Sequence, residues 1–226
     1  MKAKVSPIQE ETRQDTIRRV RNILNTLEKT YPRTTLALDF STPLELLIAL
    51  ILAAQCHDVL VNQVTVPLFK KYRTPLDWAN LDPSILEQEI RKVTFYRNKT
   101  KSIQKCCQDL VDRFGGTVPE TLEDLMSLPG VGRKTANVLR GNAMGQPAIG
   151  VDRHVGRISQ VLGLTKEKDP DKIEADLNPI VSDKHKVQFC HLLQIHGRTI
   201  CLARKPKCVE CPVNRYCPYP STYGES

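Results

Sequence analysis

The chain has 226 residues with 33 Lys and Arg against 25 Asp and Glu, which gives a net charge of +8 and a pI near 9.1. Its 40% hydrophobic and 26% charged residues are typical of a globular protein, which excludes a disordered chain, a collagen-like repeat and a coiled coil as the main architecture. The longest apolar run, residues 46–54, is much shorter than the roughly 20 residues that cross a bilayer.

Helix signals recur along the whole chain. Apolar residues at helical spacing predict a first helix with a stripe formed by Ile17, Val20, Ile23, Leu24 and Leu27. Later helix starts are marked by a capping residue followed by Pro or by an acidic residue three positions on: Thr42-Pro43, Thr74-Pro75, Asp82-Pro83, Thr121 with Asp124, and Asp169-Pro170. Residues 44–54 are apolar on every side, which predicts a helix through the core. Since no stretch alternates long enough to predict a strand, we expect an all-α fold of about ten helices.

Residues 128–137 (LPGVGRKTAN) predict a tight turn between two helices. Gly130 and Gly132 permit a reversal of the chain and a close approach of backbone to a ligand. The segment is not a P-loop, because Arg133 separates Gly132 from Lys134, and it is not a dinucleotide fingerprint, because Thr135 replaces the third glycine. A helix–hairpin–helix that grips a DNA backbone through residues 130–133 (Gly130, Val131, Gly132 and Arg133) fits better.

Lys134 is predicted to lie in the first turn of the second helix of this hairpin. The positive end of a helix disfavours an ammonium group, and a neutral amine can attack carbon and form a Schiff base. Asp152, 18 residues downstream, supplies a carboxylate that can activate such a nucleophile or stabilise positive charge on a sugar. By residue type alone, Lys134 fits a phosphate contact better than a nucleophile, and Asp152 equally fits a helix cap.

Four of the eight cysteines lie close together near the end of the chain, with the spacing C-x6-C-x2-C-x5-C: Cys201, Cys208, Cys211 and Cys217. Without a secretion signal, a metal centre explains them better than disulfides. Only one C-x2-C pair is present, so the spacing leaves both zinc and an iron–sulfur cluster open. The other four, Cys56, Cys106, Cys107 and Cys190, are predicted to be small buried residues of helices.

The positive charge is concentrated in two segments. Residues 130–160 carry a net +4 and residues 184–226 a net +5, whereas the remaining residues carry −1. A locally basic surface indicates an anionic partner, most simply nucleic acid, although a solvated face explains the same charge. A membrane surface is disfavoured, because no basic amphipathic helix or lipidation signal accompanies the charge.

The hairpin, the segment VDRHV of residues 151–155 and the tail of residues 196–217 together resemble the endonuclease III family. These enzymes are helix–hairpin–helix DNA glycosylases of base excision repair, and the resemblance covers nearly the whole chain. It implies a six-helix barrel domain at residues 36–146 with the hairpin near 119–144. It also implies a discontinuous domain of residues 1–35 and 147–226 in which the four clustered cysteines bind a [4Fe-4S] cluster.

The resemblance also implies roles for single residues. Lys134 matches the nucleophilic lysine, Asp152 the catalytic aspartate, and Gln55 a residue that enters the gap left by an extruded base. Lys205 and Lys207, between the first two cluster cysteines, are expected to face DNA phosphates. The implied activity is that of a bifunctional glycosylase and AP (apurinic/apyrimidinic) lyase, which removes oxidised pyrimidines from duplex DNA through a lysine Schiff base and cuts 3′ to the abasic site by β-elimination.

The lysine separates this sequence from adenine glycosylases of the same fold, which lack it, and from thymine-mismatch glycosylases, which commonly replace it. Departures from the family pattern occur at Cys56-His57, Thr94 and Arg153, near the expected pocket and intercalation loop.

Two alternatives remain open: a DNA-binding or mismatch-type relative without this chemistry, and a redox signalling protein. Residues 1–15 have no signal-peptide core and are too acidic for a transit peptide, so we expect a cytoplasmic, nucleoid-associated and prokaryote-like protein that acts as a monomer.

Overall fold

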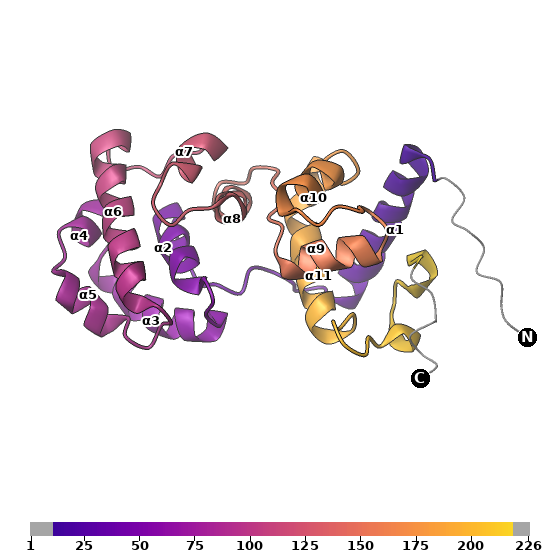
Figure 1. Cartoon of the computed structure of the whole chain (residues 1–226), viewed down its shortest axis with the longest axis horizontal. Coiled ribbons are helices and arrows are strands. Elements are labelled where there is room, and N and C mark those ends of the chain that lie inside the picture. Colours follow the sequence, from indigo (N-terminus) through magenta and orange to yellow (C-terminus); the bar gives the residue numbers. More distant parts are fainter. Residues whose placement is uncertain (1–10, 219–226) are drawn as a thin grey trace, which may run out of the picture. The chain divides into compact units, whose positions relative to one another are not determined.

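The computed structural model describes residues 11–218, and those residues form helices, turns and loops without a β-strand (Figure 1). The chain divides into two compact units. One, here called the hairpin unit, is Leu36–Ala148; the other, the cysteine unit, combines Met1–Thr35 with Ile149–Ser226. The predicted all-α class is therefore confirmed. The predicted domain limits include residues 1–10 and 219–226, which lie outside the described range, so the division into a barrel domain at 36–146 and a cluster domain at 1–35 and 147–226 stays a prediction.

The hairpin unit contains seven α-helices. They are α2 (Pro43–Ala53), α3 (Asp58–Lys71), α4 (Pro75–Ala79), α5 (Pro83–Glu89), α6 (Tyr96–Phe114), α7 (Leu122–Met126) and α8 (Arg133–Ala143). Helix α2 packs against α3, α6 and α8 and lies between α6 and α8 in Figure 1. As its all-round apolar sequence predicts, every residue from Leu44 to Leu52 except Glu45 is buried. This helix is the centre of a core that also contains Trp78, the one tryptophan of the chain.

The predicted helix starts in this unit are formed by side-chain caps. Thr42 accepts a hydrogen bond from the backbone N–H of Glu45, and Thr74 forms a reciprocal capping box with Asp77. The Glu45 carboxylate accepts from the N–H of Ser41 at 2.6 Å, so it ties down the residue before the cap. Because these caps satisfy backbone donors that a helix leaves unpaired, they fix where each helix begins.

The cysteine unit is built from both ends of the sequence. Its elements are α1 (Arg13–Thr30), α9 (Arg153–Val161), α10 (Pro170–Leu177), α11 (Lys186–Thr199) and the single-turn 3₁₀ helices η1 (Asp183–His185), η2 (Cys208–Glu210) and η3 (Asn214–Tyr216). Helix α11 packs against α1 and α9. The stripe of α1 is buried as predicted at Val20, Ile23, Leu24 and Leu27, but Ile17 is 40% exposed. Ile17 continues the predicted stripe but lies outside the core, because the first turns of α1 extend past the buried part of the stripe.

Among residues 11–218, no helix is both long and apolar enough to cross a membrane.

Candidate functional site

The turn between α7 and α8 is made by one of its two glycines. Gly130 has a φ of +81°, and a Cβ at this position would lie 3.2 Å from Cβ of Ser102 and 3.7 Å from Cγ1 of Ile51. Glycine is therefore required both for the left-handed backbone and for packing against α6 and α2. Gly132 instead has an extended backbone and caps α8, and a Cβ there would meet no atom within 4 Å. Gly130 therefore makes the reversal, whereas Gly132 leaves open space beside the helix start, as a close approach of backbone to a ligand requires.

Lys134 lies in the first turn of α8 with an exposed side chain. The opposite face of α8 is anchored in the core by Ala136, Val138 and Leu139, so the lysine has a rigid support. Its position is the predicted one. Because the first N–H groups of a helix have no intrahelical acceptor, the start of α8 presents backbone donors to an anion. The Val131 side chain is buried in the core, so this residue has only its backbone to offer to DNA.

Gln55 lies in the turn that connects α2 to α3. Its side chain is exposed and its φ is +55°, a left-handed conformation that is uncommon for a residue with a side chain. Ala54 ends the helix, and the N–H of Cys56 donates to the carbonyl of Ala53 at 3.0 Å. The helix thus ends in a tight turn that leaves the Gln55 side chain exposed. Sequence patterns gave no sign of this backbone conformation, since the turn contains no glycine.

Asp152 is the N-cap residue of α9. Its Oδ1 atom accepts hydrogen bonds from the backbone N–H groups of His154 and Val155, both at 2.8 Å. The capping interpretation is therefore confirmed, and it is compatible with a catalytic role because the second carboxylate oxygen makes none of these bonds. Lys134 belongs to the hairpin unit and Asp152 to the cysteine unit.

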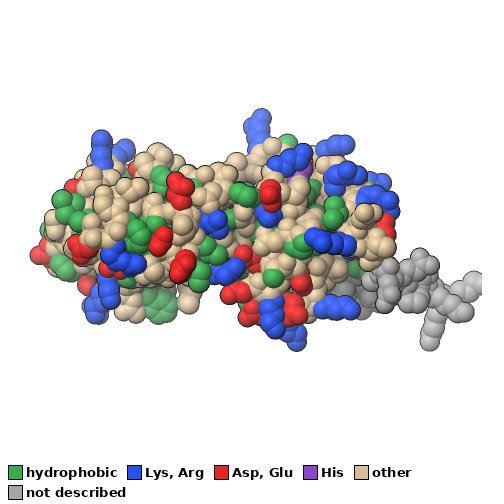
Figure 2. Space-filling view, turned by 90° about the horizontal axis from the view of Figure 1, so that it is seen from above, with side chains coloured by type: hydrophobic (Ala, Val, Ile, Leu, Met, Phe, Trp, Pro, Cys, Tyr) green, Lys and Arg blue, Asp and Glu red, His purple; other side chains and the backbone are tan. Residues whose placement is uncertain are grey.

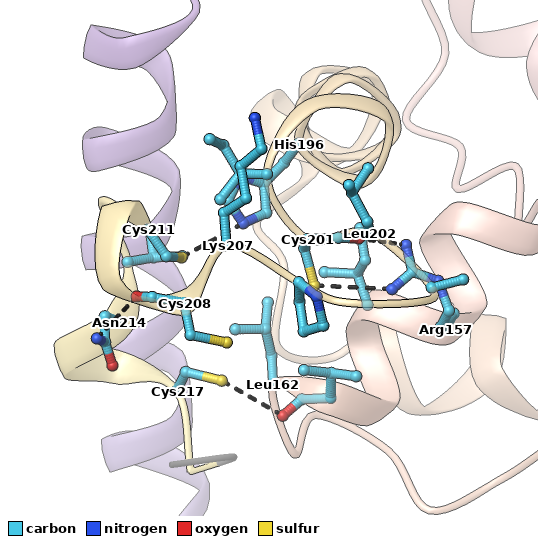
Figure 3. Close-up of a pocket in the computed structure, with 16 residues that line it drawn as sticks. Arg157, Leu162, His196, Cys201, Leu202, Lys207, Cys208, Cys211, Asn214 and Cys217 are labelled. Carbon is cyan, nitrogen blue, oxygen red and sulfur yellow. Dashed lines mark hydrogen bonds between the residues drawn. The ribbon is translucent and has the colours of Figure 1, made fainter. Parts of the chain in front are cut away.

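The four clustered cysteines line one cavity of about 120 Å³ in the cysteine unit. Figure 3 shows their thiols around this space: Cys201 follows α11, Cys208 begins η2, Cys211 follows η2 and Cys217 follows η3. Much of the remaining wall is apolar, with side chains of α9, Ile200, Pro206 and Val213. The sequence prediction that these four residues come together is confirmed.

Polar side chains that the sequence analysis did not identify surround the thiols. Arg157 Nη1 lies 3.7 Å from Sγ of Cys201, and its Nη2 donates to the carbonyl of the same residue at 2.6 Å. His196 Nε2 lies 3.6 Å from Sγ of Cys211, while its Nδ1 lies 3.1 Å from the hydroxyl of Tyr31. Only tertiary structure reveals these partners, because Tyr31 is 165 residues away from His196. Such contacts orient thiolate ligands and tune a metal group.

The surroundings set the protonation of the free thiols. Burial raises the pKa of the Cys211 thiol to about 11, and burial also raises the pKa of Cys201, an effect that the hydrogen bond from Arg157 opposes. A metal group that binds these thiols must displace their protons, which couples its binding to pH.

The donor set fits an iron–sulfur cluster. Among the described residues, no group of three or more His, Cys, Asp or Glu side chains is arranged to hold a single metal ion. Four thiols spread around one apolar cavity instead suit a group larger than an ion, and four cysteine thiolates are the usual ligand set of a [4Fe-4S] cluster. The zinc alternative, which requires four sulfurs about 2.3 Å from one ion, fits this arrangement less well.

The loop between Cys201 and Cys208 is strongly basic. Arg204, Lys205 and Lys207 are all exposed, and Lys205 has a left-handed backbone with a φ of +53°. The same loop ends beside Val209, whose side chain is 91% exposed. Figure 2 shows many Lys and Arg side chains on the surface of the cysteine unit. The predicted basic residues are therefore accessible to an anionic partner.

Three of the four remaining cysteines are buried as predicted: Cys106, Cys107 and Cys190. Burial raises the pKa of the Cys106 thiol to about 12, which makes it unreactive. Cys56 is different, because it is half-buried and lies in the turn between α2 and α3. Its prediction as a buried helical residue is wrong, since α2 ends at Ala53.

Comparison with known proteins identifies two family matches in this chain. The HhH-GPD superfamily of base excision DNA repair proteins matches residues 48–182, and the iron–sulfur binding domain of endonuclease III matches residues 201–217. The second match spans all four clustered cysteines, from Cys201 to Cys217.

Whole-length relatives agree with these matches. The chain is 46% identical over 201 residues to endonuclease III of Synechocystis sp., with 88% of this chain and 92% of that protein covered. It is 40% identical over 202 residues to endonuclease III of Bacillus subtilis, with 89% and 92% covered. A solved endonuclease III in a non-covalent complex with DNA superposes with a TM-score of 0.83 at 42% identity, over 90% of this chain and 95% of that one.

Family, fold and thiol arrangement thus lead to one assignment. The described residues supply the glycine turn with its lysine, the capped aspartate and the four-cysteine cavity, all within a chain that matches these enzymes over most of its length. The chain therefore belongs to the endonuclease III family, and it is a DNA glycosylase and AP lyase of base excision repair with a [4Fe-4S] cluster.

Proposed function

We propose that this enzyme removes oxidised pyrimidines from duplex DNA, with Lys134 as the nucleophile and Asp152 as the assisting carboxylate. The observation that carries the proposal is the exposed Lys134 in the first turn of α8, directly after the glycine turn. A solved endonuclease III trapped as a covalent intermediate with DNA, which is 42% identical to this chain, supports a covalent route. We further propose that the enzyme acts as a monomer on nucleoid DNA in the cytoplasm.

The first chemical step breaks the bond between base and sugar. After the damaged base is extruded, the neutral Lys134 amine gives its lone pair to the anomeric carbon of the sugar, and the base leaves with the electrons of the broken bond and takes up a proton. The Asp152 carboxylate lowers the barrier by stabilising positive charge on the sugar as the base departs. Its capping bonds from His154 and Val155 orient the group before the reaction begins.

The second step cuts the strand. Opening of the sugar ring converts the lysine adduct into a Schiff base, which makes the proton on the neighbouring carbon acidic. Removal of that proton forms a carbon–carbon double bond and expels the 3′ phosphate with the electrons of its bond to carbon. Hydrolysis of the Schiff base then releases the lysine, so one side chain serves both activities.

Other residues of the proposed site bind the duplex. The start of α8, with Gly132 free of side-chain atoms and Arg133 beside it, presents backbone donors to phosphate. Gln55 enters the gap that the extruded base leaves, and Lys205 and Lys207 contact phosphates from the cysteine unit. The [4Fe-4S] cluster, held by Cys201, Cys208, Cys211 and Cys217, cross-links the tail that carries this basic loop.

Borohydride trapping tests the nucleophile. The wild-type enzyme should form a covalent adduct with duplex DNA that contains thymine glycol or an abasic site, because borohydride reduces the Schiff base. Lys134→Ala should abolish the adduct while DNA binding remains measurable, and Lys101→Ala, an exposed lysine of α6, should leave the adduct unchanged. An adduct in Lys134→Ala assigns the chemistry to another group, and no adduct in the wild type indicates a water nucleophile.

Asp152→Asn separates capping from catalysis. An Asn amide oxygen accepts the same two backbone hydrogen bonds, so the start of α9 and thermal stability should change little. Loss of the charge should slow base release by at least about 100-fold in single-turnover assays. If the rate of base release is unchanged, Asp152 is only a helix cap.

A comparison of substrates tests the lesion class, and light scattering tests the oligomeric state. Base release should be faster from thymine glycol than from thymine opposite guanine, and the reverse order overturns the pyrimidine-oxidation assignment in favour of a mismatch enzyme. Light scattering of the free enzyme and of its DNA complex checks for a mass near that of one 25.5 kDa chain.

A further inference from the structure

Lys99 is a buried lysine with an unusual set of partners. It lies in the first turn of α6 and is only 6% exposed. Its Nζ atom donates hydrogen bonds to the carbonyl oxygens of Leu52, at 2.9 Å, and Ala54, at 2.6 Å. Both carbonyls belong to the C-terminal end of α2, 45 and 47 residues earlier in the chain. All three residues belong to the hairpin unit.

The end of a helix explains why a cation is held there. The last carbonyls of a helix lack N–H partners within the helix and carry partial negative charge. Lys99 satisfies two of them, which balances the cost of burying its ammonium group. That burial lowers the pKa of Lys99, and the nearby Cys56 thiol opposes the change. Because an uncompensated buried charge is so unfavourable, these two bonds tie α6 firmly to the end of α2.

The same helix end carries the strained residue Gln55. Helices that end in a left-handed residue usually place Gly there, but this chain has Gln with a φ of +55°. Such a conformation persists only where surrounding bonds hold it. The bond from Lys99 to Ala54 acts on the peptide group directly before Gln55, and the bond from Cys56 N–H to Ala53 closes the turn on its other side.

We propose that Lys99 is a positioning residue that holds the turn of residues 54–57 so that the Gln55 side chain is directed outward before DNA arrives. This inference rests on the proposed insertion of Gln55 into the gap left by the extruded base. Lys99 itself is buried, so its role is to position the turn rather than to bind DNA. It acts by reducing the disorder that Gln55 has to lose on insertion, so it favours extrusion and base release rather than the lysine chemistry.

Lys99→Met tests the proposal, because it retains the length of the side chain and removes its N–H donors. Insertion is followed by the fluorescence of 2-aminopurine placed opposite thymine glycol, and base release by single-turnover rates. The rate of the fluorescence change and the rate of base release should both fall roughly tenfold. Adduct formation with a single-stranded abasic oligonucleotide, which requires no extrusion from a duplex, should stay within about twofold of wild type. The matched control is Lys101→Met, two residues along the same helix and exposed, which should resemble wild type.

A double-mutant cycle with Gln55→Ala shows whether Lys99 acts through Gln55. If it does, Lys99→Met should slow base release little further in the Gln55→Ala background, so the two effects should not add. Additive effects overturn the role of Lys99 and leave that of Gln55 intact. The same conclusion follows if Lys99→Met has normal insertion and base release while Gln55→Ala is slow. Normal base release by Gln55→Ala overturns the insertion role, and the Lys99 proposal with it, but leaves the chemistry of Lys134 standing.

Folding of each variant is checked by the fluorescence of Trp78, which is fully buried in the same unit. If Lys99→Met does not fold, Lys99→Gln, which retains an N–H donor, replaces it. The proposal then requires rates of insertion and base release below those of the wild type. Normal rates in a variant whose hydrogen exchange at residues 54–57 is faster than in the wild type contradict it.

Discussion

The two units of this molecule are stabilised in different ways. In the hairpin unit, α2 is surrounded by apolar side chains, and the chain there carries 13 Lys and Arg against 12 Asp and Glu. The cysteine unit carries 20 Lys and Arg against 13 Asp and Glu. Within its last described segment, residues 201–218, only Val213 is fully buried. A segment with so little apolar burial needs its cysteine-bound group, whereas the hairpin unit holds itself together by packing.

Removal of one proposed cluster ligand should give the largest effect. Cys211→Ser should lose essentially all bound iron and should expose residues 201–217 to hydrogen exchange, because little else orders them. Trp78 fluorescence should stay native, since that residue lies in the hairpin unit. Cys56→Ser, at a half-buried cysteine outside the cavity, should retain its iron. Loss of the native Trp78 signal in Cys211→Ser contradicts the separate stabilisation of the two units.

A cavity beside α2 should instead destabilise the hairpin unit. Leu47 is fully buried, and Leu47→Ala should lower the free energy of unfolding of the hairpin unit by about 2–5 kcal/mol. Denaturation followed by Trp78 fluorescence measures this change. The denaturant concentration at which the cluster loses its visible absorption should be the same as in the wild type. Leu76→Ala, at a residue 51% exposed, is the control and should cost less than about 1 kcal/mol. Equal shifts of both signals indicate one cooperative molecule.

Charge reversal in the basic loop should affect DNA affinity more modestly. The double variant Lys205→Glu with Lys207→Glu should weaken binding to any duplex about 10- to 100-fold and reduce the salt slope of log Kd by about two. Reversal of Lys70 and Lys105, two exposed lysines of the hairpin unit, is the control and should change affinity less. Titrations at several salt concentrations measure both values. Unchanged affinity in the Lys205 and Lys207 variant places this loop in solvent and removes it from the DNA-binding surface.

Mild acid should weaken the cysteine unit first, and this is the smallest effect. His191 is 6% exposed, and burial lowers its pKa below the ordinary value near 6.5. The unfolded chain therefore binds more protons, so the stability due to neutral His191 is complete above about pH 6.5 and declines as the pH falls below it. The one histidine of the hairpin unit, His57, is exposed. The Asp77 carboxyl of that unit has a lowered pKa, so it titrates only in stronger acid.

Cluster absorption and Trp78 fluorescence, followed in denaturation between pH 7 and pH 5, compare the two units. His191→Gln should reduce the acid sensitivity of the cysteine unit. The same pH dependence in the variant assigns that sensitivity to other groups.

Local features of the fold followed from the sequence because they depend on neighbouring residues. Thr42 with Glu45 and Thr74 with Asp77 are three residues apart, so their capping bonds are determined by local geometry. The all-round apolar helix α2 was equally predictable, since no other environment suits it. The position of Lys134 followed from the glycine turn. The ligand set of four cysteines was visible as a spacing, and the resemblance to endonuclease III identified its metal group.

Other features depend on residues distant in the chain. The roles of the two glycines differ because Gly130 packs against Ser102 and Ile51, which lie on two other helices. The exposure of Ile17 and the partial burial of Cys56 likewise depend on where neighbouring elements end. None of these has a signature in the local pattern, because the same residues in another packing have other neighbours.

The sequence by itself determined the all-α class, the main helix starts, the glycine turn with Lys134 at the start of a helix, and the clustering of four cysteines that the structure brings to one cavity. Tertiary structure alone decided that Lys99 satisfies the end of α2 beside the strained Gln55, and that Arg157 and His196 flank the cysteine sulfurs. The physical reason is the range of the interactions: caps and periodicity act over a few residues, whereas burial and the pairing of a buried charge depend on segments that only folding brings together.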